Sequence, residues 1–478
     1  MKPIFRGPIQ LLLLLLMTAV AGADDAVVRV TGVIAGNMVW EGRVLVEGEV
    51  TLSDNATLTI RPGTSVSFRK GTGLVIGGAL IAKGNREAPI RFVSAEKAPE
   101  RGDWAGIQLR GAGESTLLER CRIDHAATAI VVLAGAPTIR ECEITTGGMG
   151  MGIERNASPV LSGNRITEMT EGGIVCMGGA TPTIERNTLA GCGAAGIFAA
   201  NNSAPVVRGN TVERCGKGIM INGTIPPVEG NILRKNGDGL HVVQSGQEQV
   251  IRGNRFEGNE VGLRCENFST PLVEGNEFTG NGDAIFCFQA SSPMIRRNSI
   301  AENRRGIACS RISSPRIVAN EIRDNGKGIH LTLSSYAVVN GNNFEGNGVH
   351  IELDDMSADW EHRVRKKPER GAQAQLATRV SRGRASPEEL AANTGDRAAL
   401  MDAVDATGNW WGKEDTEEME RKGPRANIRR LIDGYDVPVR TYEGYPGEYA
   451  QDRIRYDGWE KSRIPDAGAP TKGKETGK

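Results

Sequence analysis

The chain has 478 residues, with 58 basic and 58 acidic side chains, so its formal net charge is zero. A chain without net charge lacks the field that draws proteins to nucleic acid or anionic lipid, and we expect neither partner. The 62 glycines and the scarcity of helix-favouring runs indicate many short strands joined by tight turns, which favours an all-β fold.

Residues 1–23 have the pattern of a secretory signal peptide. Lys2 and Arg6 precede an apolar run from Leu11 to Met17, and small residues follow up to Ala23, where we expect cleavage. No later apolar stretch is long enough to span a bilayer, so we expect no membrane span. The sequence therefore predicts a soluble mature protein in the periplasm or outside the cell.

Residues 24–114 contain short β-type runs with loose spacing, and we interpret them as the N-terminal cap and the first coils. Trp40 and Trp104 are expected to close the end of the apolar interior, because an open end would expose core and backbone. Asp103, Asp124 and His125 have residue types suited to acid–base chemistry. Each of the three fits a solvated turn equally well.

Residues 115–353 carry a repeat of about 22 residues, and a repeat of this length indicates a solenoid of stacked coils. Each coil has an apolar residue two positions after a marker residue, another three positions before it, and a third about nine positions after it. Three inward columns predict three strands per coil, and the fold class is a right-handed parallel β-helix. The marker asparagines are Asn164, Asn187, Asn210, Asn231, Asn254, Asn276, Asn298, Asn320 and Asn342.

The repeated polar positions are interpreted as structural. The asparagines should stack at about 4.8 Å along the axis and bond to one another. A second ladder five residues later reads Cys192, Cys215, Asn236, Asn259, Asn281, Asn303, Asn325 and Asn347. Two residues before the first ladder, an outward column alternates in charge from coil to coil and is expected to fix the register. Its members are Glu119, Arg140, Ser162, Glu185, Arg208, Glu229, Arg252, Glu274 and Arg296.

The period is lost after the regular coils. Residues 354–405 are interpreted as a charged insertion that is partly helical, since the run beginning at Ser386 is a good helix start. Residues 406–460 are expected to form the last coil and C-terminal cap, with Asn409 as the final rung and Trp410 and Trp411 as a lid. The tail, residues 461–478, is rich in Gly, Pro and Lys and is expected to be disordered.

The coils with the patterns P-x-I-x-x-N-x-I and N-G-x-G-I resemble those of the pectin-lyase-like β-helix superfamily. Within it they resemble the family of carbohydrate-binding proteins and sugar hydrolases that includes the NosD-like periplasmic copper-maturation proteins. The resemblance covers most of the mature chain and implies the β-helix fold. It suggests a saccharide or surface role, because these motifs specify the coil and not the chemistry.

The outward side of the third strand is the candidate ligand-binding face. Aromatic side chains beside Arg and Glu on a flat sheet suit saccharide stacking, although the insertion could equally cover this face. One column was predicted to run Phe198, Met220, His241, Arg264, Phe286, Ala308, His330 and His350. A second column, two residues further on, was predicted to hold Glu266, Phe288 and Glu352.

Metal and catalytic sites have weaker sequence support. A calcium or acid–base set needs several carboxylates on neighbouring coils, yet Asp238 and Asp283 are separated by the coil of Val261. Met220 with His241, and His330 with His350, could each offer two soft ligands to copper. An inward column holds Cys176, Cys265, Cys287 and Cys309, which we interpret as small buried apolar residues and not as disulfides.

Three functions follow as hypotheses. The favoured one is a non-catalytic, monomeric exported protein that binds a polysaccharide or another cell-envelope component. The alternatives are a carbohydrate-active enzyme (lyase, hydrolase or epimerase) whose catalytic residues the sequence does not assign, and a periplasmic copper-handling accessory protein. No cofactor is assigned, with calcium and copper left open.

Overall fold

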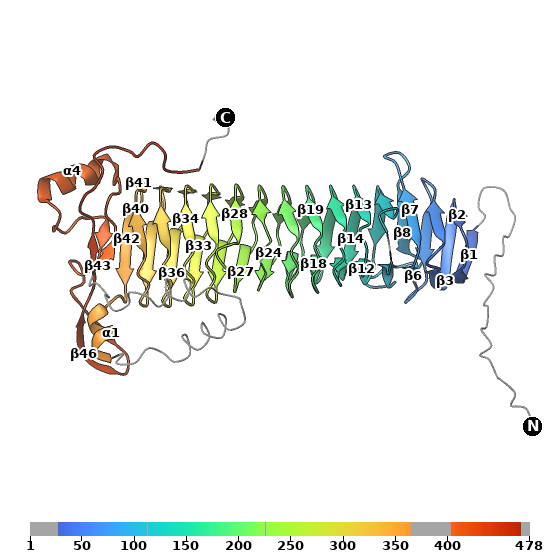
Figure 1. Cartoon of the computed structure of the whole chain (residues 1–478), viewed down its shortest axis with the longest axis horizontal. Coiled ribbons are helices and arrows are strands. Elements are labelled where there is room, and N and C mark those ends of the chain that lie inside the picture. The colour runs from blue at the N-terminus through green and yellow to red at the C-terminus, as the bar shows by residue number, and fades with distance from the viewer. Residues whose placement is uncertain (1–26, 112, 225, 365–402, 470–478) are drawn as a thin grey trace, which may run out of the picture. The chain divides into compact units, whose positions relative to one another are not determined.

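The computed structural model describes residues 27–111, 113–224, 226–364 and 403–469. The chain divides into two compact units at the boundary between Thr183 and Ile184. In each unit the strands stack in parallel as successive coils (Figure 1). A regular coil gives one strand to each of three sheets, which we name the first-strand, second-strand and third-strand sheets. The signal-peptide pattern and the helix start at Ser386 lie outside the described residues.

In the first unit, two long strands contribute to both the second-strand and third-strand sheets: β1 (Val27–Ile34) and β3 (Arg43–Leu52). The first-strand sheet contains β2 (Met38–Trp40), β4 (Thr57–Ile60), β7 (Ala79–Lys83), β10 (Leu117–Glu119), β13 (Thr138–Arg140) and β16 (Val160–Ser162). The second-strand sheet adds β5 (Ser65–Phe68), β8 (Ile90–Ser94), β11 (Cys121–Asp124), β14 (Glu143–Gly147) and β17 (Arg165–Met169). The third-strand sheet adds β6 (Gly73–Ile76), β9 (Gly106–Leu109), β12 (Thr128–Val132), β15 (Met149–Ile153) and β18 (Gly172–Cys176).

The strand β19 (Thr183–Glu185) spans the boundary. In the second unit, the first-strand sheet contains β22 (Val206–Arg208), β25 (Val228–Glu229), β28 (Val250–Arg252), β31 (Leu272–Glu274), β34 (Met294–Arg296), β37 (Arg316–Val318), β40 (Val338–Asn340), β43 (Ala403–Asp405) and β47 (Arg453–Arg455). The second-strand sheet contains β20 (Thr188–Ala190), β23 (Thr211–Glu213), β26 (Ile232–Arg234), β29 (Arg255–Glu257), β32 (Glu277–Thr279), β35 (Ser299–Ala301), β38 (Glu321–Arg323) and β41 (Asn343–Glu345).

The third-strand sheet of the second unit carries the candidate face. It contains β21 (Ala195–Ala199), β24 (Lys217–Asn222), β27 (Asp238–Val243), β30 (Val261–Glu266), β33 (Asp283–Phe288), β36 (Arg305–Ser310), β39 (Lys327–Thr332), β42 (Val349–Asp354) and β44 (Leu431–Ile432). Outside the coils lie an antiparallel hairpin of β45 (Val439–Tyr442) and β46 (Tyr445–Ala450) and the helices α1 (Ala358–Val364) and α4 (Gly412–Lys422).

The core consists of the inward columns that the repeat predicted. In the coil of β33, for example, Ile285 is fully buried and pairs with Leu263 on the coil before and Ile307 on the coil after. The three-strand prediction is confirmed, since every coil buries one apolar side chain of each column. Burial of apolar area of this kind contributes about 25 cal/mol per Å² and is the main stabilising term.

The asparagine ladder satisfies the backbone hydrogen-bonding groups of the turn between the first and second strands of each coil. Asn276 Oδ1 accepts from the backbone N–H of Asn254 at 2.9 Å and from its Nδ2 at 3.0 Å. Asn276 Nδ2 donates to the carbonyl of Ile251 at 2.9 Å and to Asn298 Oδ1 at 3.0 Å. In the second ladder the same contacts recur, and Cys215 Sγ accepts from the backbone N–H of Cys192 at 3.4 Å.

The alternating charge column forms ion pairs between neighbouring coils. Arg296 pairs with Glu274 at 2.8 Å, and Arg252 pairs with the same carboxylate at 3.7 Å. In the first unit, Arg140 lies 3.0 Å from Glu119. These contacts support the register role, because each charge meets the opposite sign one coil away.

In several coils the turn after the third strand places residues other than glycine in the left-handed region. Arg311 and Ile312 have φ values of 54° and 69°, and in an earlier coil Asn201 and Asn202 have φ values of 52° and 61°. Asparagine tolerates this conformation, but a β-branched residue there costs roughly 1–2 kcal/mol.

We therefore expect Ile312→Asn to raise the free energy of unfolding by about 1 kcal/mol, measured as the shift of the urea midpoint. Ile312→Val keeps the branched side chain and should give no gain. A large loss of stability in the asparagine variant would show that the apolar contacts of Ile312 outweigh its backbone strain.

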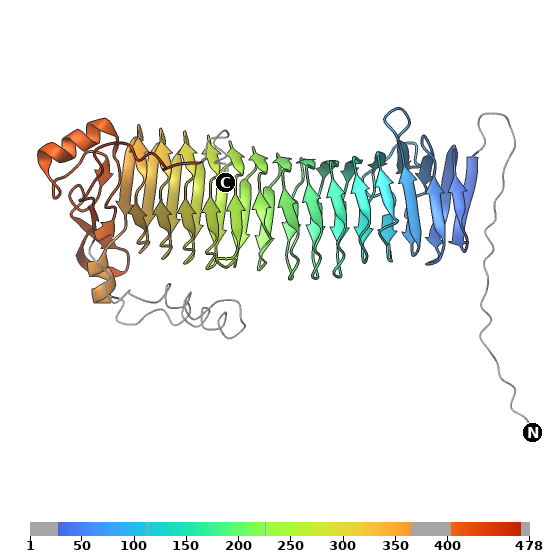
Figure 2. The same ribbon diagram turned by 45° about the horizontal axis from the view of Figure 1, so that its top comes forward.

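The C-terminal end of the second unit closes with aromatic residues. Asn409 is the final rung, accepting from the backbone N–H of Asn342 at 2.8 Å. Trp411 is fully buried and stacks on Phe344 with ring centroids 4.7 Å apart. Figure 2 shows α4, which follows Trp411, beyond the last coils. The expected final rung is confirmed, and the buried Trp411 fits the predicted lid.

Residues 461–469 of the tail contact the coils of the second unit, whereas residues 470–478 lie outside the described residues. Arg463 lies 2.9 Å from Glu321, and the side-chain amide of Asn343 bonds to both the N–H and the carbonyl of Ile464. Gly468 donates to the carbonyl of Ala319 at 2.9 Å. Composition alone missed this because polar side chains on the coils, and not an apolar stripe, hold the segment.

Candidate functional site

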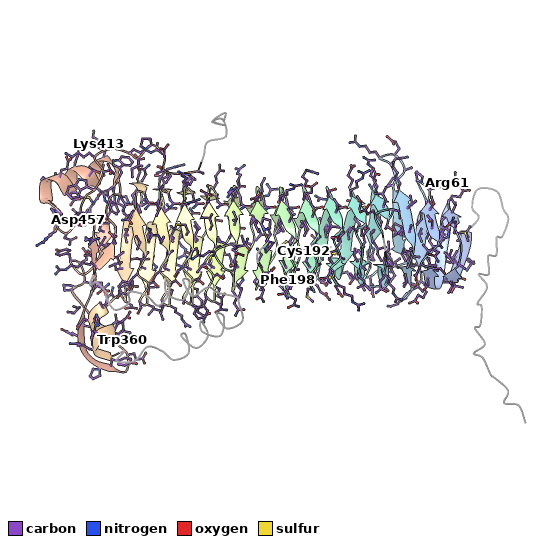
Figure 3. The ribbon with its side chains drawn as sticks, viewed as in Figure 1. Arg61, Cys192, Phe198, Trp360, Lys413 and Asp457 are labelled. Atoms are coloured by element: carbon purple, nitrogen blue, oxygen red, sulfur yellow. The ribbon has the colours of Figure 1, made fainter. Side chains whose placement is uncertain are left out.

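The outward column of the third-strand sheet runs in the predicted order over seven coils. Backbone pairing aligns Phe198, Met220, His241, Arg264, Phe286, Ala308 and His330. Figure 3 labels Phe198 at one end of this column. The next member is Glu352, not His350. The second outward column contains Glu266 and Phe288, followed by Ser310. We refer to these two columns, with the strand-start residues beside them, as the third-strand face.

The predicted columns of His350 and Glu352 were therefore wrong. In the last regular coil, Glu352 and not His350 is the residue that pairs with His330. His350 occupies the column that holds glycine in most other coils, and it is fully buried. A Cβ at Gly328 would lie 2.6 Å from the carbonyl oxygen of His350 in the next coil. Glycine, or alanine as at Ala284, occupies this column where a complete coil stacks above it. At β42 a side chain fits, and His350 Nε2 bonds to Asp415 of α4 at 2.9 Å.

The candidate residues are less exposed than the sequence suggested. His241 is 8% exposed and Ala308 2%, whereas Phe286, Phe288 and the other members of the face are half-buried. Adjacent coils are only about 4.8 Å apart, so the outward side chains of neighbouring coils shield one another from solvent. The face thus offers ring edges and charged heads and not fully exposed rings.

The first charged cluster surrounds His241. Its Nε2 lies 3.0 Å from Glu266, and its Nδ1 lies 3.5 Å from Asp238. Arg264 Nε donates to both oxygens of Asp238 at 3.0 and 3.1 Å. Burial lowers the pKa of His241, partly opposed by the two carboxylates. The imidazole is therefore neutral near pH 7 and is held between two carboxylates beside a guanidinium.

Two phenylalanines follow on β33. The ring centroids of Phe286 and Phe288 lie 5.7 Å apart with the planes tilted by 31°. The guanidinium of Arg264 lies over Phe286 at 5.1 Å, and that of Arg311 lies over Phe288 at 5.0 Å. Arg264 comes from the coil before the rings and Arg311 from the turn of the coil after them, so the aromatic pair is bracketed by two cations.

The second charged cluster lies beyond the rings. Asp283 is 5% exposed and accepts two hydrogen bonds from Arg305, both at 2.6 Å. Arg305 Nη1 lies 3.3 Å from His330 Nδ1, and Lys327 pairs with Glu352. Burial lowers the pKa of His330, as it does for His241. The sequence had not singled out Arg305, Arg311 or Lys327. Arg311 lies in the turn that follows β36. Arg305 and Lys327 could have been found from the column of residues that begin the third strands. That column reads Lys217, Asp238, Val261, Asp283, Arg305 and Lys327.

The alternative group in the first unit has structural contacts. Asp103 accepts from Ser94 Oγ at 2.7 Å and from the backbone N–H of Glu100 at 2.9 Å. The backbone hydrogen bond from Glu100 is the main cause that lowers the pKa of Asp103. Burial raises the pKa of Asp124, and the backbone carbonyl of Asp124 accepts a hydrogen bond from Trp104 Nε1 at 2.8 Å. These bonds hold a turn together and leave no convergent pair of carboxylates.

Within the described ranges, no group of three His, Cys, Asp or Glu side chains could hold a metal ion. Met220 does lie beside His241, but both imidazole nitrogens of His241 face carboxylates. All eight cysteines are free and buried, and Cys265, Cys287 and Cys309 stack on consecutive coils as predicted. Burial raises the pKa of Cys265, so this thiol remains protonated.

Family models match three parts of the chain. They are "Right handed beta helix region" over residues 105–256, "Pectate-lyase like beta helix domain" over residues 32–129, and "Periplasmic copper-binding protein (NosD)" over residues 225–370. With the parallel coils described above, they show that the chain is a right-handed parallel β-helix protein. The resemblance inferred from the repeat is confirmed at this level.

The solved structures that are similar to this chain have low identity to it. The periplasmic alginate epimerase AlgG is 12% identical, with 69% of this chain and 85% of that chain covered and a TM-score of 0.39. The A-module of mannuronan C-5 epimerase AlgE6 from Azotobacter vinelandii is 12% identical, with 67% and 90% covered and a TM-score of 0.32. The catalytic domain of a GH87 alpha-1,3-glucanase is 11% identical, with 64% and 60% covered and a TM-score of 0.29. No curated protein matches the chain.

Among the described residues, no helix is both long enough and apolar enough to cross a membrane.

Proposed function

We propose that this chain is an exported protein that binds a polysaccharide, or another saccharide of the cell envelope, on the third-strand face without converting it. The observation that carries the proposal is the pair Phe286 and Phe288, whose rings lie 5.7 Å apart on one strand between two guanidinium groups. Aromatic surface packs against sugar C–H groups, and charged side chains beside it bind hydroxyls and ring substituents.

Two further observations support this proposal. The His241 cluster lies on the coils before the rings, and Arg305 and His330 lie on the coils after them. A linear ligand along the coil axis therefore has polar partners on both sides of the rings. The sequence before residue 24 has the composition of an export signal, and the family whose model matches residues 225–370 is described as periplasmic. We propose the periplasm or the cell exterior as the place of action.

A glycan array tests the proposal directly. We expect the wild-type chain to retain a defined set of glycans and the Phe286→Ala/Phe288→Ala variant to lose them, with affinity falling about tenfold for each ring removed. Tyr445→Ala is the matched control, because Tyr445 is an exposed aromatic residue of the hairpin at 44% exposure. Unchanged binding by the double variant would remove the third-strand face from consideration.

A carbohydrate-active enzyme is the second candidate, and the His241 cluster favours it. A neutral imidazole 3.0 Å from Glu266 and beside Arg264 has the groups that proton abstraction next to a sugar carboxylate requires. A lyase would give rising absorbance from unsaturated products, a hydrolase would release reducing ends, and an epimerase would exchange ring hydrogen with solvent. Any such turnover that His241→Gln abolishes, with Met220→Leu as a neighbouring control, would replace the non-catalytic proposal.

A copper-handling role would need ligands beyond the described residues. Copper titration of the purified metal-free chain separates this alternative from the saccharide proposal. Tight binding with a stoichiometry near one that His330→Ala or His241→Ala removes would support the copper role.

A further inference from the structure

The guanidinium of Arg311 differs from the other cations on the coils nearest to the aromatic pair. Arg264 is paired with Asp238, Arg305 and Arg304 with Asp283, and Lys327 with Glu352. The side chain of Arg311 is exposed, and its one described side-chain contact is the ring of Phe288 at 5.0 Å. In the described part of the chain, Arg311 thus stands beside the aromatic pair without a carboxylate partner.

The position of Arg311 over Phe288 leaves its hydrogen-bond donors without a partner among the described residues. A guanidinium that lies over an aromatic ring contacts it through its planar face, and its N–H groups point outward in the plane. These donors match the two oxygens of a carboxylate, or two oxygens of a sulfate or phosphate, in a bidentate arrangement. Stacking also restricts the long side chain before any ligand arrives, which lowers the entropic cost of binding.

Within the second unit, an arginine at this turn position is specific to the coil of β36. The turn position of Arg311 is occupied by Asn201, Asn267, Gln289 and Leu333 in other coils of the second unit, and all of them have positive φ. Arg311 and Ile312 therefore keep a strained backbone that asparagine would adopt at lower cost.

We infer that Arg311 binds an acidic group of the saccharide, so the ligand of the third-strand face is an acidic glycan whose ring stacks at Phe286 and Phe288. This inference rests on the proposed saccharide function and deepens it. The acidic group is a carboxylate or a sulfate, and the shared chemistry is an anion with at least two oxygens directed at the guanidinium. Arg264 is paired with Asp238 and lies over Phe286, on the opposite side of the aromatic pair.

The test uses titrations of the full-length mature chain with four polymers. Polygalacturonate and dextran sulfate are the acidic probes, and methyl-esterified pectin and dextran are their neutral counterparts. We expect binding to at least one acidic probe, weakened about ten- to a hundredfold in Arg311→Gln and weakened by raised salt. Arg311→Lys keeps the charge but loses the planar fork, so its affinity should lie between those of the wild type and Arg311→Gln. The carboxylate and sulfate arms identify which anion is recognised.

Arg316→Gln is the matched control, because Arg316 is an exposed arginine of the first-strand sheet in the same coil. Thermal melts of Arg311→Gln exclude a folding defect. If Arg311→Gln binds the acidic probe like the wild type while Phe286→Ala/Phe288→Ala does not, the inference on Arg311 is overturned and the saccharide function stands. Binding to the neutral polymers alone would also overturn it. If no glycan of the array and none of the four polymers binds the wild type, the proposed function itself fails.

Discussion

Replacing Asn276 with alanine is expected to lower the free energy of unfolding by about 3–5 kcal/mol. The substitution removes the acceptor of two donors of Asn254 and the donor for the carbonyl of Ile251 and for Asn298. All of these groups are fully buried, and an unsatisfied buried polar group costs about 1–3 kcal/mol. Urea unfolding followed by circular dichroism measures the change.

Two other variants decide whether the ladder is the cause. Asn276→Cys should be less harmful than alanine, because cysteine occupies this column naturally at Cys142, where it bonds to the carbonyl of Arg140 at 3.4 Å. Glu277→Ala removes an exposed side chain of the adjacent position and should change stability by less than about 0.5 kcal/mol. An alanine variant at Asn276 as stable as Glu277→Ala would contradict the structural role of the ladder.

The second large effect is expected in acid, where protonation of His350 should open the C-terminal cap. His350 is fully buried, and its Nε2 donates to Asp415, which also pairs with Arg430 at 2.6 Å. Its Nδ1 lies 3.2 Å from Nδ2 of Asn347. The hydrogen bond from Asn325 to Asn347 Oδ1 fixes the orientation of this amide. The group that faces His350 is therefore the amide NH2, which can only donate. A proton on Nδ1 would therefore face a donor, and the last rung of the second ladder would be displaced.

The sign of the pH effect follows from the pKa of His350. Burial is the largest cause and lowers this pKa, while Asp415 opposes the change. The folded pKa is thus below the unfolded value of about 6.5, so the folded state prefers the neutral ring. The stabilisation is fully present above about pH 6.5 and is lost as the pH falls through the lower folded value.

Tryptophan fluorescence can follow this transition, because the ring of Trp411 lies 5.9 Å from His350. We expect the cap to open as the pH falls below about 6.5 and passes through the lower folded pKa of His350. The pKa of Asp415 is lowered by His350 and Arg430 against the cost of its burial. His350→Gln should be less stable at pH 7 and should lose this part of the pH dependence. An identical acid transition in the glutamine variant would show that another group causes it.

The regular coils could be predicted from the sequence because each rule repeats many times. The asparagine column, the inward Ile and Leu columns and the alternating charges all give the same register, and any one of them would have placed Phe286 beside Arg264. The prediction failed for His350, where the coil has no complete neighbour above it and the glycine position accepts a side chain.

Contacts between different elements were not predictable in the same way. The position of Arg311 over Phe288 depends on the left-handed turn after β36, which the residues Arg311 and Ile312 themselves disfavour. The order of residues 463–468 depends on Asn343 and Glu321, whose column otherwise reads as surface. Periodicity gives a residue's column, but it does not give the direction of a long side chain at a turn.

The structure of the chain bound to an oligosaccharide selected from the array tests the central claim most directly. The account predicts sugar rings against Phe286 and Phe288 on the third-strand face, with an acidic substituent in contact with the guanidinium of Arg311. A ligand bound to the first-strand or second-strand sheet, or at the hairpin of β45 and β46, would contradict it.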